Sequence, residues 1–149
     1  MSETAVADEN QSSLIASFYV ADMLFGIDAL RVEEAIKVTD ITAVPHAPDH
    51  IMGVINLRGK IVTIVNLARK LGLPESPVTE HSRFVIVSWD DERIGFFVDS
   101  VSDVAALDAS AMQPPPSNVK GVQGANFEGV QQTAAGLLIV LKLQAVLDG

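Results

Sequence analysis

Short stretches of alternating apolar and polar residues run along most of the chain, and they predict β-strands. In residues 14–20, for example, Leu14 and Phe18 fall on one face while Ile15 and Ser17 fall on the other, which is the period of a strand. Comparable stretches are predicted as strands at residues 24–28, 32–38, 54–57, 61–65, 83–89, 93–98, 101–107, 127–132 and 137–141. About ten short strands separated by turn residues indicate β-barrels rather than alternating strands and helices.

One segment of the chain returns later in altered form. Residues 53–71, GVINLRGKIVTIVNLARKL, are echoed by residues 129–147, GVQQTAAGLLIVLKLQAVL, and residues 25–35 are echoed by 94–104. Each long copy begins with Gly-Val, contains a second glycine and ends at the start of a predicted short helix. The sequence therefore predicts one β-rich unit used twice. We place the boundary between the copies in the polar linker at residues 75–82.

Composition narrows the classes of function. The chain has 149 residues, no cysteine and a formal net charge of −9. The length predicts one domain, 14–149, after a polar and acidic leader, 1–13, that we expect to be disordered. The charge argues against nucleic acid and anionic membranes as partners. The absence of a signal-like start, of a long apolar run and of cysteine predicts an intracellular protein without a membrane span.

Candidate catalytic and metal-binding residues are few. His46 and His50 have the spacing of paired ligands on a helix, but Pro48 between them argues against a helix there. Ser100 lacks the Gly-x-Ser-x-Gly surroundings of an activated nucleophile. We therefore predict no enzymatic activity, no catalytic residue, no metal site and no cofactor.

The turn at Arg58 and Gly59 is the strongest candidate for recognition. A guanidinium beside a tight turn can pair with a carboxylate in a fork, and Glu34 on the strand at 32–38 is the favoured partner. The alternative is that Arg58 is a solvated turn residue. Arg58 also belongs to a basic group, with Lys60, Arg69 and Lys70, that favours an acidic protein partner.

These motifs together resemble one known family. Phe25-Gly-Ile-Asp, Asn56-Leu-Arg-Gly, Ile64-Val-Asn-Leu and Val98-Asp-x-Val-x-Asp-Val are similar to the CheW family of bacterial chemotaxis coupling proteins. The resemblance extends in order from about Leu14 to Leu147. It implies a mainly β fold of two tandem five-stranded SH3-like barrels that share an apolar seam, with short helices after strands. We expect one barrel at residues 24–75 and the other at 83–136, with the terminal segments 14–20 and 137–149 packed on them.

The resemblance also implies a function. Members of this family are non-catalytic adaptors that couple transmembrane chemoreceptors to a CheA-type histidine kinase, so a cytoplasmic protein recruited to receptor arrays is expected. The receptor's helical tip would dock in a groove. Carried over to this chain, the groove residues are Ile27, Val32, Glu34, Leu57, Arg58, Gly59 and Val98. The kinase is expected to contact barrel ends, including turns of the second half, through residues that the sequence does not assign.

Two departures from the family pattern and two alternatives remain. Lys142 stands where the family usually has Asp or Asn, so the N-cap of the last helix is lost or altered. The polar loop at 117–125 puts in doubt any contact that uses it. The alternatives are an adaptor of the same fold in a non-chemotactic pathway, such as twitching or development, and a barrel that binds a small molecule or a metal through His46 and His50.

Overall fold

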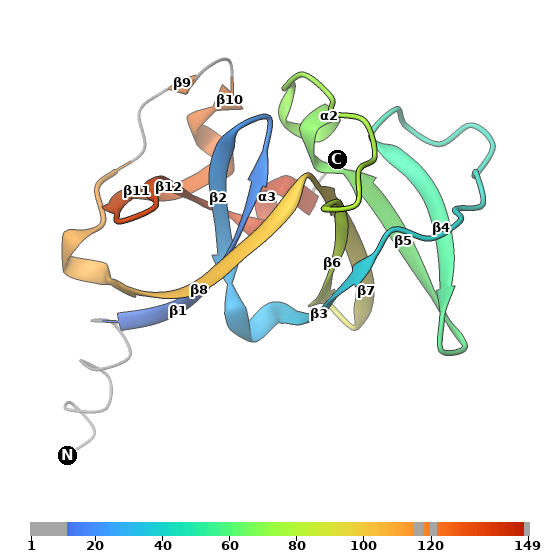
Figure 1. Ribbon diagram of the computed structural model, residues 1–149, viewed down its shortest axis with the longest axis horizontal. Helices are drawn as coiled ribbons and strands as arrows, with labels where there is room; N and C mark the ends of the chain where they lie inside the picture. Colours follow the sequence, from blue (N-terminus) through green and yellow to red (C-terminus); the bar gives the residue numbers. More distant parts are fainter. Residues whose placement is uncertain (1–11, 115–117, 120–121, 148–149) are drawn as a thin grey trace.

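Two five-stranded sheets dominate the computed structural model, which describes residues 12–114, 118–119 and 122–147 (Figure 1). The first sheet has the strand order β11-β12-β2-β1-β8, and the second has the order β3-β6-β7-β5-β4. The fold is mainly β, as predicted. Among the described residues, no helix combines the length and the apolar character needed to cross a membrane.

Each predicted strand is present. The first sheet consists of β1 (Ser12–Val20), β2 (Met23–Asp28), β8 (Ser100–Asp108), β11 (Phe127–Thr133) and β12 (Gly136–Leu141). The second consists of β3 (Val32–Lys37), β4 (Ile51–Leu57), β5 (Lys60–Asn66), β6 (Arg83–Trp89) and β7 (Glu92–Val98). The short elements are η1 (Ala29–Arg31), α2 (Leu67–Leu71), η2 (Ala109–Ala111), β9 (Asn118–Val119), β10 (Val122–Gln123), η3 (Gly124–Asn126) and α3 (Leu143–Leu147).

The chain is ordered two residues earlier than the leader prediction. Ser12 and Ser13 begin β1, where they lie opposite Asp108 and Leu107 of β8. Their backbone pairing with β8 explains the difference, because polar side chains do not prevent a ladder at the end of a strand. Residues 1–11 of the expected leader lie outside the described residues.

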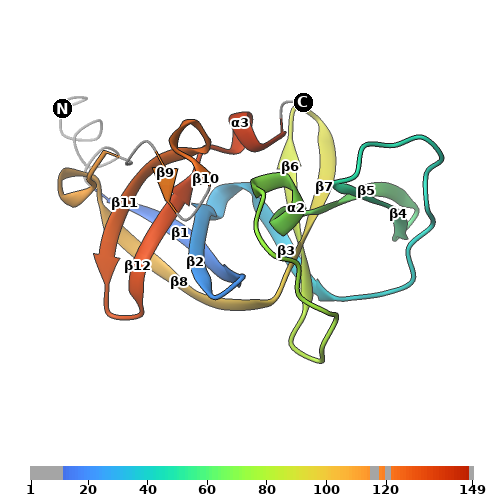
Figure 2. The same cartoon turned by 90° about the horizontal axis from the view of Figure 1, so that it is seen from above.

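The two sheets divide the chain differently from the expected barrels. All five strands of the second sheet lie between residues 32 and 98, whereas the first sheet joins β1 and β2 to β8, β11 and β12. The terminal strands are thus integral members of the first sheet. After β2 the chain crosses to the second sheet through η1, and after β7 it crosses back into β8 (Figure 2). The order of elements was readable from the sequence, but the choice of pairing partner depends on tertiary packing.

The internal repeat survives in this arrangement as matching strand positions. β3, β6, β7, β5 and β4 of the second sheet correspond in order to β8, β1, β2, β12 and β11 of the first. In each sheet the only parallel pair among those recorded joins corresponding strands, β5 with β7 and β12 with β2. Each sheet therefore takes its first hairpin from one repeat and its other three strands from the other repeat.

The repeated Gly-Val pair has a structural cause. Val54 exchanges two backbone hydrogen bonds of 2.9 Å with Thr42, and Val130 exchanges bonds of 2.9 and 3.0 Å with Gln113. A Cβ atom on Gly53 would overlap the Thr42 carbonyl oxygen, and one on Gly129 would lie 2.7 Å from the Gln113 oxygen. In both copies glycine thus lets a preceding loop bond to the edge strand.

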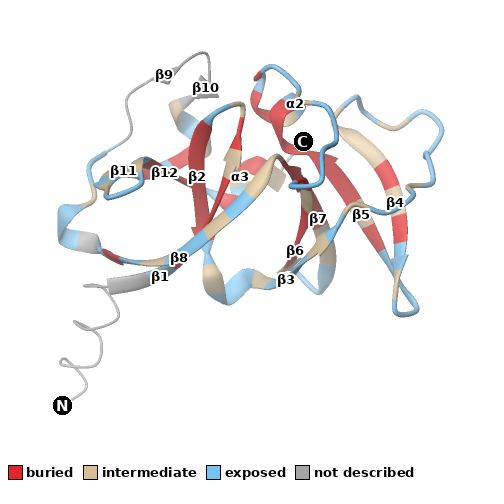
Figure 3. Ribbon diagram, viewed as in Figure 1, coloured by how far each residue is buried: buried red, intermediate tan, exposed pale blue. Residues whose placement is uncertain are grey.

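Buried apolar residues form three clusters. Figure 3 shows where the buried stretches lie along the strands. One cluster lies inside each sheet, and the largest lies between the two sheets. Along β7, Phe97 belongs to the cluster inside the second sheet, whereas Phe96 and Val98 belong to the cluster between the sheets. The predicted apolar seam is confirmed. Its members include Phe18, Phe25, Ile27, Leu67, Val85, Val87, Ile139 and Leu141.

Candidate functional site

The turn between β4 and β5 presents Arg58 in an uncommon backbone conformation. Arg58 and Gly59 have φ values of 51° and 84°, as in the two-residue turns that suit a β-hairpin. The side-chain oxygen of Asn56 accepts a hydrogen bond of 2.9 Å from the Gly59 amide. The Asn-Leu-Arg-Gly motif is therefore a self-bonded turn that fixes where the Arg58 side chain starts.

Arg58 forms the predicted ion pair with Glu34 of β3. The Arg58 side chain is 69% exposed and that of Glu34 is 29% exposed. β3 and β4 are the two edge strands of the second sheet, so the ion pair links opposite edges of that sheet. Because the pair is solvated, its contribution to stability is at most about 1 kcal/mol. The ion pair therefore contributes little to holding the fold together.

The neighbouring Glu33 has a partner of its own. The register of β3 against β6 shifts between Val32 and Glu34, which makes Glu33 the extra residue of a bulge. Its carboxylate lies 2.7 Å from Nε of Arg93 on β7. The two adjacent glutamates thus bind separate arginines and do not form a catalytic pair with each other.

Part of the predicted basic group is neutralised within the chain. Arg69 on α2 makes an ion pair of 2.7 Å with Glu75 and donates a hydrogen bond of 2.8 Å to the Asp49 carbonyl. The bond to Glu75, and then its charge, raise the pKa of Arg69. Since Arg58 is also paired, the group is a weaker attractor of acidic proteins than the sequence suggested.

The two histidines of the metal alternative lie on irregular backbone. His46 sits in a turn with a φ of 63°, and His50 immediately precedes β4. Partial burial, and then the charge of Lys70, lower the pKa of His50, while Asp49 opposes this shift. In the described part of the chain, no group of three or more His, Asp or Glu side chains is arranged to hold a metal ion.

Four large apolar side chains, which we call the apolar strip, are exposed on and beside β1 and β8. They are Leu14, Leu30, Val101 and Val104, which are 55%, 88%, 43% and 58% exposed. Val104 lies opposite Ala16, and Val101 opposite Phe18, because a register shift adds one residue to β8 between these pairs. Leu30 lies on η1, which contacts β1, and Asp28 fixes that turn by accepting a 2.9 Å hydrogen bond from the Leu30 amide.

Five of the predicted groove residues reach the surface in the structure and two do not. Glu34, Arg58 and Gly59 are together at the surface, and Val32 and Leu57 are half-buried beside apolar clusters. Ile27 and Val98, in contrast, are fully buried in the seam between the sheets. Their side chains have no surface to offer a partner, so the prediction that they line a groove is wrong.

Sequence reasoning missed the exposed members of the apolar strip. Val101 and Val104 were placed in a short strand, where valines at a spacing of three fall on opposite faces in regular alternation. The register shift within β8 puts both valines on the outer face. An indication of this surface in the sequence was Leu30, a large apolar residue directly before Arg31. The structure places Leu30 in a capped turn and not within a strand.

Comparisons with known proteins agree with this architecture. The family model described as a CheW-like domain matches residues 15–149. The chemotaxis protein CheW of Treponema pallidum is 33% identical, with 93% of this chain and 83% of that protein covered. CheW of Bacillus subtilis is 30% identical, covering 88% and 84%. A crystal structure of the scaffolding protein TtCheW from Thermoanaerobacter tengcongensis, 33% identical, superposes with a TM-score of 0.84 over 92% of this chain and 88% of that one. The chain therefore belongs to the CheW family of non-catalytic chemotaxis scaffold proteins.

Proposed function

We propose that this protein couples chemoreceptors to a CheA-type histidine kinase by binding both. The observation that carries the receptor half of this proposal is the apolar strip, an exposed apolar surface on β1, on the edge strand β8 and on η1. Exposed apolar residues grouped on one surface mark protein interfaces more often than isolated ones do. A membrane-bound receptor partner would bring the protein to receptor arrays.

The receptor would dock through its helical tip. An amphipathic helix laid along the apolar strip would bury Leu30, Val101 and Val104, whose exposure otherwise costs free energy. Glu34 lies on β3, which directly follows η1, so the paired Glu34 and Arg58 would supply a polar margin near Leu30. An apolar centre with a polar margin is the usual composition of a protein interface.

A pull-down with three purified components tests the proposal. Immobilised receptor cytoplasmic fragment is incubated with the kinase regulatory domain, with and without this protein. We expect the kinase domain to be retained only when this protein is present. Retention of this protein by the receptor alone would support only the receptor half. Failure to bind either component would overturn the proposal.

A further inference from the structure

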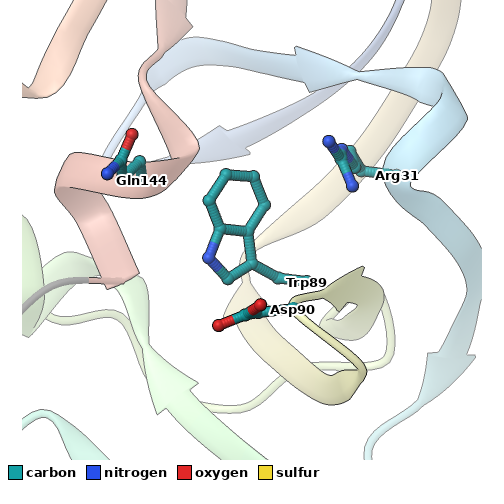
Figure 4. Close-up of a pocket in the computed structure, with 4 residues that line it drawn as sticks. All are labelled: Arg31, Trp89, Asp90 and Gln144. Carbon is teal, nitrogen blue, oxygen red and sulfur yellow. The ribbon is translucent and has the colours of Figure 1, made fainter.

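A pocket of about 490 Å³ lies where η1, the turn after β6 and α3 meet. The described residues that line it are Arg31, Trp89, Asp90 and Gln144, and the Trp89 ring stands between Gln144 and Arg31 (Figure 4). Trp89 is half-buried and packs on the seam between the sheets, so this packing holds its ring in place as one wall of the pocket. None of these four residues belongs to the apolar strip or to the Arg58 turn.

Arg31 is unusual among the described arginines. Its guanidinium carbon lies 5.0 Å from the centroid of the Trp89 ring. Arg58, Arg69 and Arg93 each pair with a glutamate, and Arg83 donates to backbone carbonyls. In the described part of the chain, the Trp89 ring is the one interaction partner of the Arg31 guanidinium, and no carboxylate lies within ion-pair distance of it.

The chemistry of this arrangement selects an anionic ligand. A guanidinium stacked on an aromatic ring still has N–H groups along its edge, which match the two oxygens of a carboxylate. The stack also holds the side chain in place, which reduces the entropy lost on binding. Gln144 adds amide donors to the same space, whereas the Asp90 carboxylate opposes an incoming negative charge.

We propose that this pocket receives a carboxylate side chain of the kinase regulatory domain. The inference rests on the proposed function for the identity of that partner. Seen from above, α3 and β8 lie on opposite sides of the molecule (Figure 2). Leu30 of the apolar strip directly precedes Arg31 on η1, so a receptor on the strip would lie beside the pocket and leave its α3 side open to a second protein.

The affinity of the full-length protein for the kinase regulatory domain tests this inference. Trp89 is the one tryptophan of the chain, so its fluorescence reports on the pocket directly when the kinase domain contains no tryptophan. Arg31→Gln should weaken kinase binding roughly tenfold, the loss of one charge-assisted pair. Asp90→Asn should tighten it by about two- to threefold, because one opposing charge is removed.

Matched variants make the result decisive. Asp90 and Asp91 both have positive φ, at 53° and 64°, in the same exposed turn, and asparagine tolerates that conformation. Asp91 does not line the pocket, so Asp91→Asn should leave the affinity unchanged.

Receptor binding should be normal in all three variants, which also shows that they fold. Unchanged kinase affinity in Arg31→Gln, or equal effects of the two aspartate changes, would overturn the inference. A wild-type protein that does not bind the kinase domain would overturn the proposed function and this inference with it.

Discussion

Arg58 and Glu34 are 24 residues apart in the sequence and form an ion pair between the edge strand β3 and the turn that follows the other edge strand, β4, of the second sheet. The second repeat has no equivalent, because Thr133, Ala134 and Ala135 occupy the corresponding turn region. The repeat accounts for the shared architecture, whereas this difference marks one copy for a separate role.

Arg58→Glu should abolish receptor binding with little effect on the fold. The pair is solvated, so we expect the free energy of unfolding to fall by no more than about 1 kcal/mol, including repulsion from Glu34. Thermal melting and the receptor pull-down measure the two effects. The reversed pair, Glu34→Arg with Arg58→Glu, should recover the stability. Normal receptor binding by the single variant would remove Arg58 from the site.

Val104→Asp should weaken receptor binding at least about tenfold, because a charge would be buried under the docked helix. Val78→Asp is the matched control, since Val78 is also exposed, at 59%, but lies in the linker between the repeats. Both variants should melt within a few degrees of the wild type, because both side chains are exposed. Equal loss of binding in the two variants would show that added negative charge, and not the apolar strip, is responsible.

Gly53→Ala should be far more damaging than Gly59→Ala. At Gly53 the new Cβ would overlap the Thr42 carbonyl oxygen at a φ of 145°, and we expect a loss of about 3 kcal/mol or more. At Gly59, with a φ of 84°, no atom lies within 4 Å of the new Cβ, so backbone strain alone should cost about 1 kcal/mol. Urea unfolding at equilibrium compares the two, and similar losses would count against the role assigned to the Thr42 bridge.

The two helices that end the long repeats should respond in opposite ways to a change at the N-cap. Asn66 accepts a hydrogen bond of 3.2 Å from the Arg69 amide, so Asn66→Ala should cost about 1 kcal/mol or more. Lys142 has no acceptor in its side chain, and its backbone oxygen already accepts from the Val146 amide. Lys142→Asn should therefore stabilise the protein by about 0.5–1 kcal/mol, as thermal melting would show. A lower melting temperature would mean that the lysine has another structural role.

Acidification should destabilise the protein partly through His50. Its pKa is lowered in the folded state, so below about pH 6.5 the unfolded chain binds the proton more readily. Stability should therefore fall as the pH drops through that value and level off below the folded pKa. Between about pH 7.5 and 5, the melting temperature of His50→Gln should fall less than that of the wild type. The difference should be small, since Lys70 and Asp49 act on His50 in opposite directions. An identical pH dependence in the two proteins would exclude this contribution.

Local patterns in the sequence were sufficient for the strands, the Arg58 turn and the Asn66 cap. Each of these depends on neighbours within a few residues, such as Asn56 bonding to Gly59. The partner of Arg58 was also predictable, because few glutamates lie on a nearby strand.

What the sequence did not reveal depends on contacts between distant segments. Ile27 and Val98 were expected at a surface, but packing of one sheet on the other buries both. Val101 and Val104 share a face only because β8 carries an extra residue opposite β1. Neither the crossing between sheets nor that shift leaves a periodic trace in the chain.

The strands of the second sheet come from one continuous stretch of the chain, whereas those of the first sheet come from two. This difference sets an order for folding during synthesis. The second sheet has all its strands once Val98 has been made, whereas the first still lacks β8, β11 and β12. Translation from Val98 to Leu141 then takes seconds, at about 5–20 residues per second. Through that interval Phe18 and Phe25 have no partners from β12 to cover them. The newborn chain is thus most exposed to aggregation after its second sheet is complete and before the last hairpin, β11 and β12, has been made.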